Sequence, residues 1–177
     1  MSEIFEPSTP SLGRNPSNLT ALKVPPHSVE AEQAVLGGLM IDNSEWDTVA
    51  DAVLSVDFYR SEHQLIFQTM TQQSEARSPI DVVTLVEALD SLKELENAGG
   101  LDYLSELAGN ARGTANIHAY TDIIRERAIL RRLISVANNI ADTGYNTGGK
   151  KAAEILNGAE QQVFNIRDER PKDQGPV

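Results

Sequence analysis

The fold of this chain is decided by an unbroken stretch from Asn116 to Thr143, which reads NIHAYTDIIRERAILRRLISVANNIADT. Its 28 residues include no glycine and no proline, so the pattern predicts one helix roughly 40 Å long at ~1.5 Å per residue. The apolar side chains cover a wide stripe of this helix: Ile117, Tyr120, Ile123, Ile124, Ile129, Leu130, Leu133, Ile134, Ala137 and Ile140. A stripe this wide needs more than one neighbour.

A second helix is predicted downstream, where apolar residues recur at Ala152, Leu156, Ala159, Val163 and Ile166. Residues 144–149, GYNTGG, join the two helices, and their glycines allow the chain to reverse. We therefore expect an antiparallel hairpin whose pairing residues are Leu130, Leu133, Ala137, Leu156 and Val163. Because two helices enclose little core, the other face of this hairpin is expected to meet another subunit.

Upstream of the long helix, apolar residues at helical spacing predict several shorter helices. Side chains suited to capping stand at the expected starts of these helices: Ser28, Asp42 with Glu45, Ser61 with Gln64, and Asp81. The β-branched residues after Asp81 also allow a short strand, although Glu87 and Ala88 favour a helix. The sequence thus predicts an all-α fold, in which a compact helical head is followed by a long antiparallel helical hairpin.

The composition along the chain predicts where these parts begin and end. Residues 1–24 are rich in proline, serine, threonine and asparagine, which is typical of a disordered tail. The acidic helical head is expected over residues 25–113 and the helical hairpin over residues 114–167. Residues 168–177, DERPKDQGPV, resemble the tail in composition and are expected to begin a linker.

Charge is distributed unevenly over these parts. The 177 residues carry a net charge of −11, but residues 28–107 alone hold 16 acidic and 3 basic residues. Residues 112–177 hold 8 acidic and 10 basic residues, so the acidity belongs to the head. An acidic surface repels the phosphate backbone, and we expect no direct grip on DNA by this chain.

Four arginines are grouped in the long helix, at positions 125, 127, 131 and 132. They allow a phosphate-binding patch, or a solvated face on which Asp122 and Glu126 partner the arginines. No basic or aromatic residues reinforce a patch elsewhere, which favours the solvated face.

Residue types exclude several classes of site. The chain has no cysteine, which removes disulfides, thiolate nucleophiles and cysteine-ligated zinc. Its three histidines, at positions 27, 63 and 118, are too widely spaced to predict a metal site. No carboxylate pair stands out for acid–base catalysis, and no catalytic residue is predicted. Because no apolar run approaches 18 residues, we expect a cytoplasmic protein without a membrane segment.

One segment comes close to a catalytic motif. Residues 144–151, GYNTGGKK, match the phosphate-binding loop G-x-x-x-x-G-K-[ST] except at Lys151, where the hydroxyl that holds magnesium should stand. That loop must also follow a buried strand, whereas this segment follows the long helix. The segment is therefore predicted to be a connector.

A run of residues typical of one protein family begins at residues 22–40, LKVPPHSVEAEQAVLGGLM, and continues through residues 57–59 (DFY), 78–81 (SPID), 99–104 (GGLDYL), 115–117 (ANI), Tyr120 and 124–128 (IRERA). In these residues the chain resembles the DnaB family of bacterial replicative DNA helicases. It covers about residues 22–168, and the match is to the N-terminal domain and the start of the linker. The family's RecA-like motor domain, which holds ATP and Mg²⁺, has no counterpart in these residues.

The resemblance implies a role in assembly and recruitment. In the family, six such domains form a collar, a trimer of dimers, whose hairpins pair between subunits. The collar is also where primase docks and where a helicase loader or a phage-encoded helicase partner acts. Matching residues 134–140, ISVANNI, and 154–156, EIL, carries the family's primase-responsive positions to Ile134, Ile140 and Ile155. The alternative for these three isoleucines is hairpin core.

Two functions are compatible with these features. The first is the N-terminal collar domain of a replicative helicase, which assembles subunits and recruits primase, while a separate domain hydrolyses ATP and unwinds DNA. The second is a free-standing helical adaptor that oligomerises and bridges partners without a motor.

Overall fold

The computed structural model describes residues 23–168, and this part of the chain contains helices and no β-strand. The helices are α2 (Val29–Ile41), α3 (Trp46–Ala52), α4 (Ser61–Glu75), α5 (Val82–Ser91), α6 (Gly100–Gly109), α7 (Ile117–Tyr145) and α8 (Ala152–Asp168). Two 3-10 turns, η1 (Asn43–Glu45) and η2 (Ser55–Asp57), flank α3. The predicted all-α class is confirmed, and the strand considered after Asp81 is replaced by α5. The expected tail and linker lie almost wholly outside the described residues.

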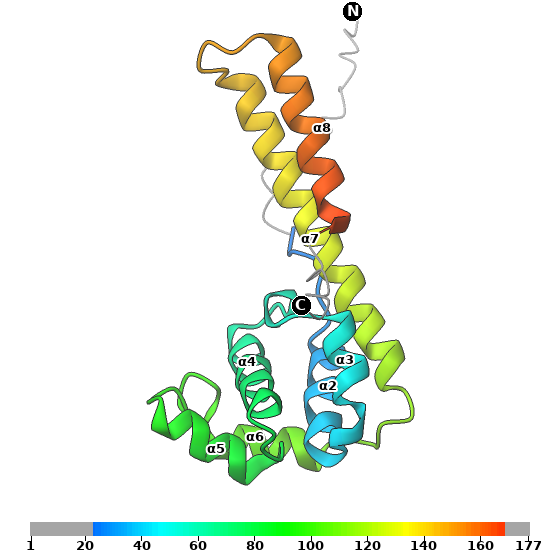
Figure 1. The fold of residues 1–177 in the computed structure, drawn as a ribbon, viewed down its shortest axis with the longest axis vertical. Helices are drawn as coiled ribbons and strands as arrows, with labels where there is room; N and C mark the ends of the chain where they lie inside the picture. The colour runs from blue at the N-terminus through cyan, green and yellow to red at the C-terminus, as the bar shows by residue number, and fades with distance from the viewer. Residues whose placement is uncertain (1–22, 169–177) are drawn as a thin grey trace, which may run out of the picture.

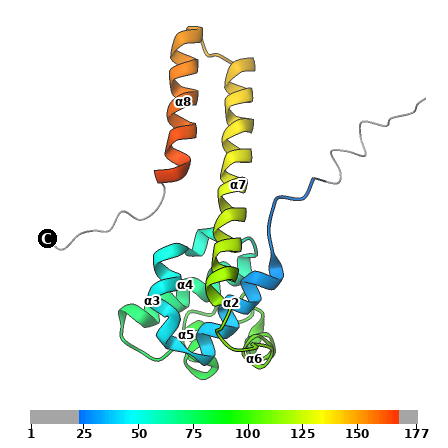
Figure 2. The same cartoon turned by 90° about the vertical axis from the view of Figure 1, so that its right-hand side faces the viewer.

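The molecule consists of a rounded head and a long projection (Figure 1). Helices α2 to α6 and the first half of α7 form the head, and the second half of α7 rises out of it. Figure 2 shows α8 running back beside α7 toward the head, so the two helices are antiparallel. The predicted order, a compact head followed by a helical hairpin, is confirmed.

Two of the predicted caps form as expected. The Ser28 hydroxyl accepts a hydrogen bond from the Ala31 amide at 3.2 Å and starts α2. The Asp81 carboxylate accepts from the Thr84 amide at 2.9 Å, and the Thr84 hydroxyl in turn accepts from the Asp81 amide at 3.0 Å. Such reciprocal bonds satisfy amides that the first helical turn leaves free.

The other two predicted caps differ from expectation. Asp42 starts the 3-10 turn η1, where the Ser44 hydroxyl and amide donate to its carboxylate and lower its pKa. Ser61 is the first residue of α4 and makes no cap, while the side-chain amide of Gln64 donates to the Phe58 carbonyl. The spacing of Ser61 and Gln64 predicted the wrong cap, because Arg60 and not Ser61 occupies the N-cap position of α4.

Helix α2 is the centre of the head, with residues from Ala31 to Met40 buried on several sides. The rings of Trp46 and Phe58 both pack against the ring of Phe67, with centroids 5.1 and 4.9 Å from it. The first half of α7 completes the core with Ile117, Ile124 and Ala128, each at most 3% exposed. None of the described helices has the length and apolar character that crossing a membrane requires.

A pair of glycines lets two helices approach α2 closely. A Cβ placed on Gly37 would lie 2.2 Å from the carbonyl oxygen of Leu107 on α6, and one on Gly38 would lie 3.2 Å from Ile117 Cδ1 on α7. The first of these distances is far shorter than a van der Waals contact, so only glycine fits at position 37. The glycine pair therefore fixes how α6 and α7 sit on α2.

Candidate functional site

A buried polar network connects α2, α4 and α6. Glu32, only 1% exposed, accepts hydrogen bonds from the backbone amides of Tyr59 and Arg60 at 3.0 and 3.4 Å. The ring of His63, fully buried, joins Glu32 through Nδ1 at 2.8 Å and the Tyr103 hydroxyl through Nε2 at 2.6 Å. No sequence pattern predicted this network, because its members lie 31 and 40 residues apart and a first-turn acid such as Glu32 is normally solvated.

A second polar cluster holds the root of the hairpin against the head. The Arg131 guanidinium on α7 donates to the carbonyl oxygens of Pro26 at 2.7 Å and Asp57 at 2.5 Å, and it lies 5.5 Å from the centre of the Tyr59 ring. Burial lowers the pKa of Arg131, against the opposing charges of Glu32 and Asp57. The His27 ring stacks on the Tyr59 ring of this cluster, with the two ring centres 4.1 Å apart.

Arg132 forms an ion pair with Asp57 in the same cluster. The predicted solvated arginine face is therefore wrong for Arg131 and Arg132, because their partners lie in the head rather than at Asp122 and Glu126. Helix periodicity identified which residues share a face of α7, but it could not show that this face is turned toward the head.

The two helices of the hairpin meet along a narrow stripe. Half-buried residues recur at i, i+4 and i+7 on both helices: Val136, Ile140 and Thr143 on α7, and Ile155, Ala159 and Gln162 on α8. The Asn139 amide donates to the Gln162 side-chain oxygen at 2.7 Å and bridges the helices. Farther down, Ile166 is 7% exposed at the end of α8.

The predicted pairing residues occupy a different strip of the hairpin. Their side chains are exposed: Leu130 by 37%, Leu133 by 45%, Leu156 by 61%, Val163 by 48%, and Ala137 is exposed as well. Successive residues of a helix are rotated by about 100° about its axis, so on each helix these residues lie about a quarter turn from the contact stripe, in the same direction of rotation. Because the two helices are antiparallel, this places all five on one face of the hairpin. We call these five residues the hairpin face.

The three isoleucines taken from the family resemblance divide between these environments. Ile134 is 46% exposed and lies beside the hairpin face, whereas Ile140 and Ile155 are half-buried in the contact stripe. The structure therefore brings Ile140 and Ile155 to the same stripe but leaves Ile134 apart from them.

The segment resembling a phosphate-binding loop is the tip of the hairpin. Gly144 is still part of α7, and Gly148 and Gly149 adopt φ values of +61° and +82° in the connection to α8. A helix precedes the segment, not a strand. This geometry agrees with the predicted connector, since glycine reverses the chain at positive φ without steric strain.

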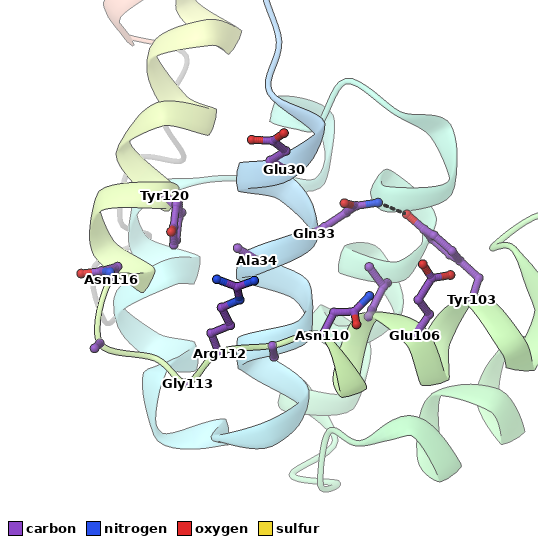
Figure 3. Close-up of a pocket in the computed structure, with 13 residues that line it drawn as sticks. Glu30, Gln33, Ala34, Tyr103, Glu106, Asn110, Arg112, Gly113, Asn116 and Tyr120 are labelled. Carbon is purple, nitrogen blue, oxygen red and sulfur yellow. Dashed lines mark hydrogen bonds between the residues drawn. The ribbon is translucent and has the colours of Figure 1, made fainter.

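The head contains a groove of about 600 Å³ that the sequence did not reveal (Figure 3). Its floor is the strip of α2 that includes Gln33 and Ala34, its walls come from α6 and α7, and residues 110–116 close one end. The lining residues are Glu30, Gln33, Ala34, Tyr103, Glu106, Leu107, Asn110, Ala111, Arg112, Gly113, Ala115, Asn116 and Tyr120. Among residues 23–168, no three histidine or carboxylate side chains are grouped as metal ligands would be.

Comparison with known proteins gives a consistent result. A family model described as the DnaB-like helicase N terminal domain matches residues 24–126. The replicative DNA helicase DnaB of Haemophilus influenzae is 45% identical over 163 residues, which are 92% of this chain and 35% of that protein. DnaB of Buchnera aphidicola subsp. Schizaphis graminum is 53% identical over 159 residues, 89% of this chain and 34% of that protein. The chain thus spans about a third of the length of these relatives.

Solved structures agree with this assignment. The crystal structure of the N-terminal domain of DnaB helicase from Mycobacterium tuberculosis superposes with a TM-score of 0.76 at 31% identity, over 80% of this chain and 99% of that one. A DnaB-like replicative helicase, solved in a study of its interactions with primase, shares the fold with a TM-score of 0.67 at 23% identity, over 85% of this chain and 33% of that one. With its sequence matched by the family model over more than half its length and its fold matched over 80% of the chain, this chain belongs to the family of DnaB-like helicase N-terminal domains.

Proposed function

We propose that this chain acts as the N-terminal collar domain of a replicative DNA helicase, where it assembles subunits and recruits primase. The observation that carries the proposal is the exposed hairpin face in a chain that belongs to this family. The comparisons favour this function over a free-standing adaptor, because the relatives matched over about 90% of the chain are replicative helicases.

Subunit pairing is the first part of the proposal. Five apolar residues exposed on one face of a two-helix projection form a patch that a soluble monomer would leave in contact with water. A second hairpin presents the same patch, so two copies pair about a two-fold axis and bury both. In the proposal, three such pairs build a hexameric collar.

Sedimentation measures this pairing directly. The unmodified chain is expected to self-associate at concentrations up to ~100 μM, since weak encounters have dissociation constants in the μM to mM range. Leu133→Gln with Leu156→Gln should shift the chain toward monomer, whereas Leu92→Gln, at a residue 56% exposed directly after α5, should not. Monomer alone for the unmodified chain, or equal association of all variants, would count against pairing through the hairpin.

Recruitment of primase is the second part. Two structures with the same fold come from work on DnaB proteins and their interactions with primase. We propose that Ile134 contacts primase and that Ile140 and Ile155 act by shaping the hairpin, because only Ile134 is largely exposed. A helicase loader or a phage-encoded helicase partner would use the same collar.

Calorimetric titration of primase tests this division. Ile134→Asn should weaken binding while leaving circular dichroism and melting unchanged. Val83→Asn, at a residue 72% exposed on α5, is the matched control and should bind normally. Unaltered primase affinity in Ile134→Asn would remove Ile134 from the interface.

The motor functions are assigned to another part of the helicase. In the proposal, ATP and Mg²⁺ bind a RecA-like domain that also grips and separates DNA, and the protein works at the replication fork in the cytoplasm. This chain should hydrolyse no ATP, and activity above that of a Lys150→Ala variant would contradict the assignment. Tight binding of DNA at low salt would contradict the absence of a direct DNA grip.

A further inference from the structure

The groove in the head has the shape of a seat for a helix. Its floor is a strip of one helix, formed by Glu30, Gln33 and Ala34 at i, i+3 and i+4, and α6 and α7 rise on either side (Figure 3). Helices pack by laying the ridge of one into the furrow of another. Apolar surface is present inside, at Ala34, Ala111 and the 37% exposed Tyr120, so the buried side of an amphipathic helix finds contacts there.

The groove also holds charges that the described chain does not pair. Glu30, Glu106 and Arg112 all line it, and none of them forms an ion pair with another residue of the 23–168 range. Figure 3 shows Glu30 near one end of the α2 strip, and the Arg112 side chain extending from the closed end toward Ala34. The site thus offers two carboxylates and one guanidinium, which reaches into the groove from its closed end.

One wall of the groove is held in place before any partner arrives. The Tyr103 hydroxyl is fixed by His63 at 2.6 Å and by Gln33 Nε2 at 3.3 Å, and His63 is anchored in turn by the buried Glu32. A preformed wall reduces the loss of conformational freedom on binding. The same wall lies close to the floor, because Gly37 leaves room for the α6 backbone to approach α2.

We propose that this groove is a docking site for a positively charged amphipathic helix of a protein partner. Lysine or arginine side chains of that helix pair with Glu30 and Glu106, and its C-terminal carbonyls or an acidic residue face Arg112. Charge complementarity selects this occupant: the head carries 16 acidic and 3 basic residues over positions 28–107, so a basic segment is attracted and a second, equally acidic head is repelled.

The identity of the partner rests on the proposed function: primase is the protein that supplies this helix. The groove and the hairpin face are then two separate surfaces, one for primase and one for subunit pairing. Ile134 lies on the hairpin rather than in the groove, so primase would contact the collar at two places.

Charge reversal in the groove tests the proposal. Binding of purified primase to the 177-residue chain is measured by calorimetry at low and high salt for Glu30→Lys/Glu106→Lys, for Arg112→Glu and for a matched control. The control, Glu87→Lys/Asp90→Lys, makes the same change in net charge at two exposed residues of α5 outside the groove. Circular dichroism and melting establish that each variant is folded.

The expected result is specific to the groove. Glu30→Lys/Glu106→Lys should weaken primase binding at least about tenfold at low salt and flatten its salt dependence, because two attractive pairs become repulsive. Arg112→Glu should weaken it about threefold, and the control should change it by less than about threefold. Ala34→Trp, which fills the groove without altering charge, should also weaken binding.

Three outcomes would overturn the proposal, and they differ in whether the proposed function also fails. If the unmodified chain binds primase and the groove variants match the control, the groove is not the docking site, while the proposed function stands. If the groove variants lose self-association and keep primase binding, the occupant is a second copy of this chain. If the unmodified chain fails to bind primase, the recruitment proposal fails together with this inference.

Discussion

The head and the hairpin bury their apolar residues to different extents. In the head, Leu36, Phe58 and Leu85 are fully buried. In the hairpin, Leu133, Leu156 and Phe164 remain 45%, 61% and 67% exposed. Burial of apolar area is the main favourable contribution to folding. This difference in burial indicates that the head is stabilised by its own core, whereas the hairpin presents an apolar surface suited to another chain.

Helix α7 belongs to both regions, and its packing changes along its length. Ile117, Ile124 and Ala128 are core residues of the head, whereas no residue of α7 after Arg132 is buried, and this part of the helix runs beside α8 (Figure 2). The Arg131 and Arg132 cluster lies at this change. A polar clamp at the root thus supports a projection that has little core of its own.

The largest expected effect comes from the head's buried network. Glu32→Ala removes the acceptor for two backbone amides and for His63, so the free energy of unfolding should fall by about 3 to 5 kcal/mol. Glu30→Ala, at an exposed residue of the same helix turn, should cost less than about 1 kcal/mol. Urea denaturation measures both, and equal losses would show that burial of Glu32 is not the cause.

The same substitution in the two regions should have opposite signs. Gly37→Ala places a Cβ against the backbone of α6 and should destabilise the head by about 1 to 3 kcal/mol. Gly158→Ala, in the middle of α8 with nothing within 4 Å, should stabilise by about 0.5 to 1 kcal/mol because alanine favours the helix. Thermal melting of both variants measures these changes in stability. If both substitutions stabilise or both destabilise the chain, the contrast between the two regions is contradicted.

A smaller effect is expected where the two regions join. Arg131→Ala removes two charge-assisted hydrogen bonds from a half-exposed side chain and should cost about 1 to 2 kcal/mol. Hydrogen exchange of the Ala31 amide, which donates to the Ser28 hydroxyl at the start of α2, should accelerate with it, since Pro26 loses its anchor to α7. Arg127→Ala, one turn earlier on the helix, is the control. Unchanged exchange in Arg131→Ala would show that the clamp does not hold the segment before α2.

The smallest effect on stability is expected on the hairpin face. Leu133→Gln should change the free energy of unfolding by less than about 0.5 kcal/mol under conditions where the chain is monomeric, because the side chain is already 45% exposed. Phe58→Ala in the head is the contrasting variant and should cost about 3 to 5 kcal/mol. A large loss in monomeric Leu133→Gln would mean that the hairpin face is structural within one chain.

Much of the fold followed from local patterns. The long glycine-free stretch predicted α7, the apolar spacing from Ala152 to Ile166 predicted α8, and Ser28 and Asp81 marked two helix starts. Less of the candidate sites followed. The resemblance pointed to Ile134 on the hairpin, but no pattern indicated the groove beside Glu30, because its walls come from three helices that are distant in sequence.

The sequence by itself determined the helical class, the hairpin, the acidic head and the family, because these depend on residue type and on spacing along the chain. Only the tertiary structure decided which charges are paired. Glu32 became a buried acceptor, Arg131 became an anchor for the hairpin, and Glu106 remained facing an open groove. The physical reason is that hydrogen bonds and burial act between residues close in space, and one-dimensional spacing specifies a helix face without specifying what covers it.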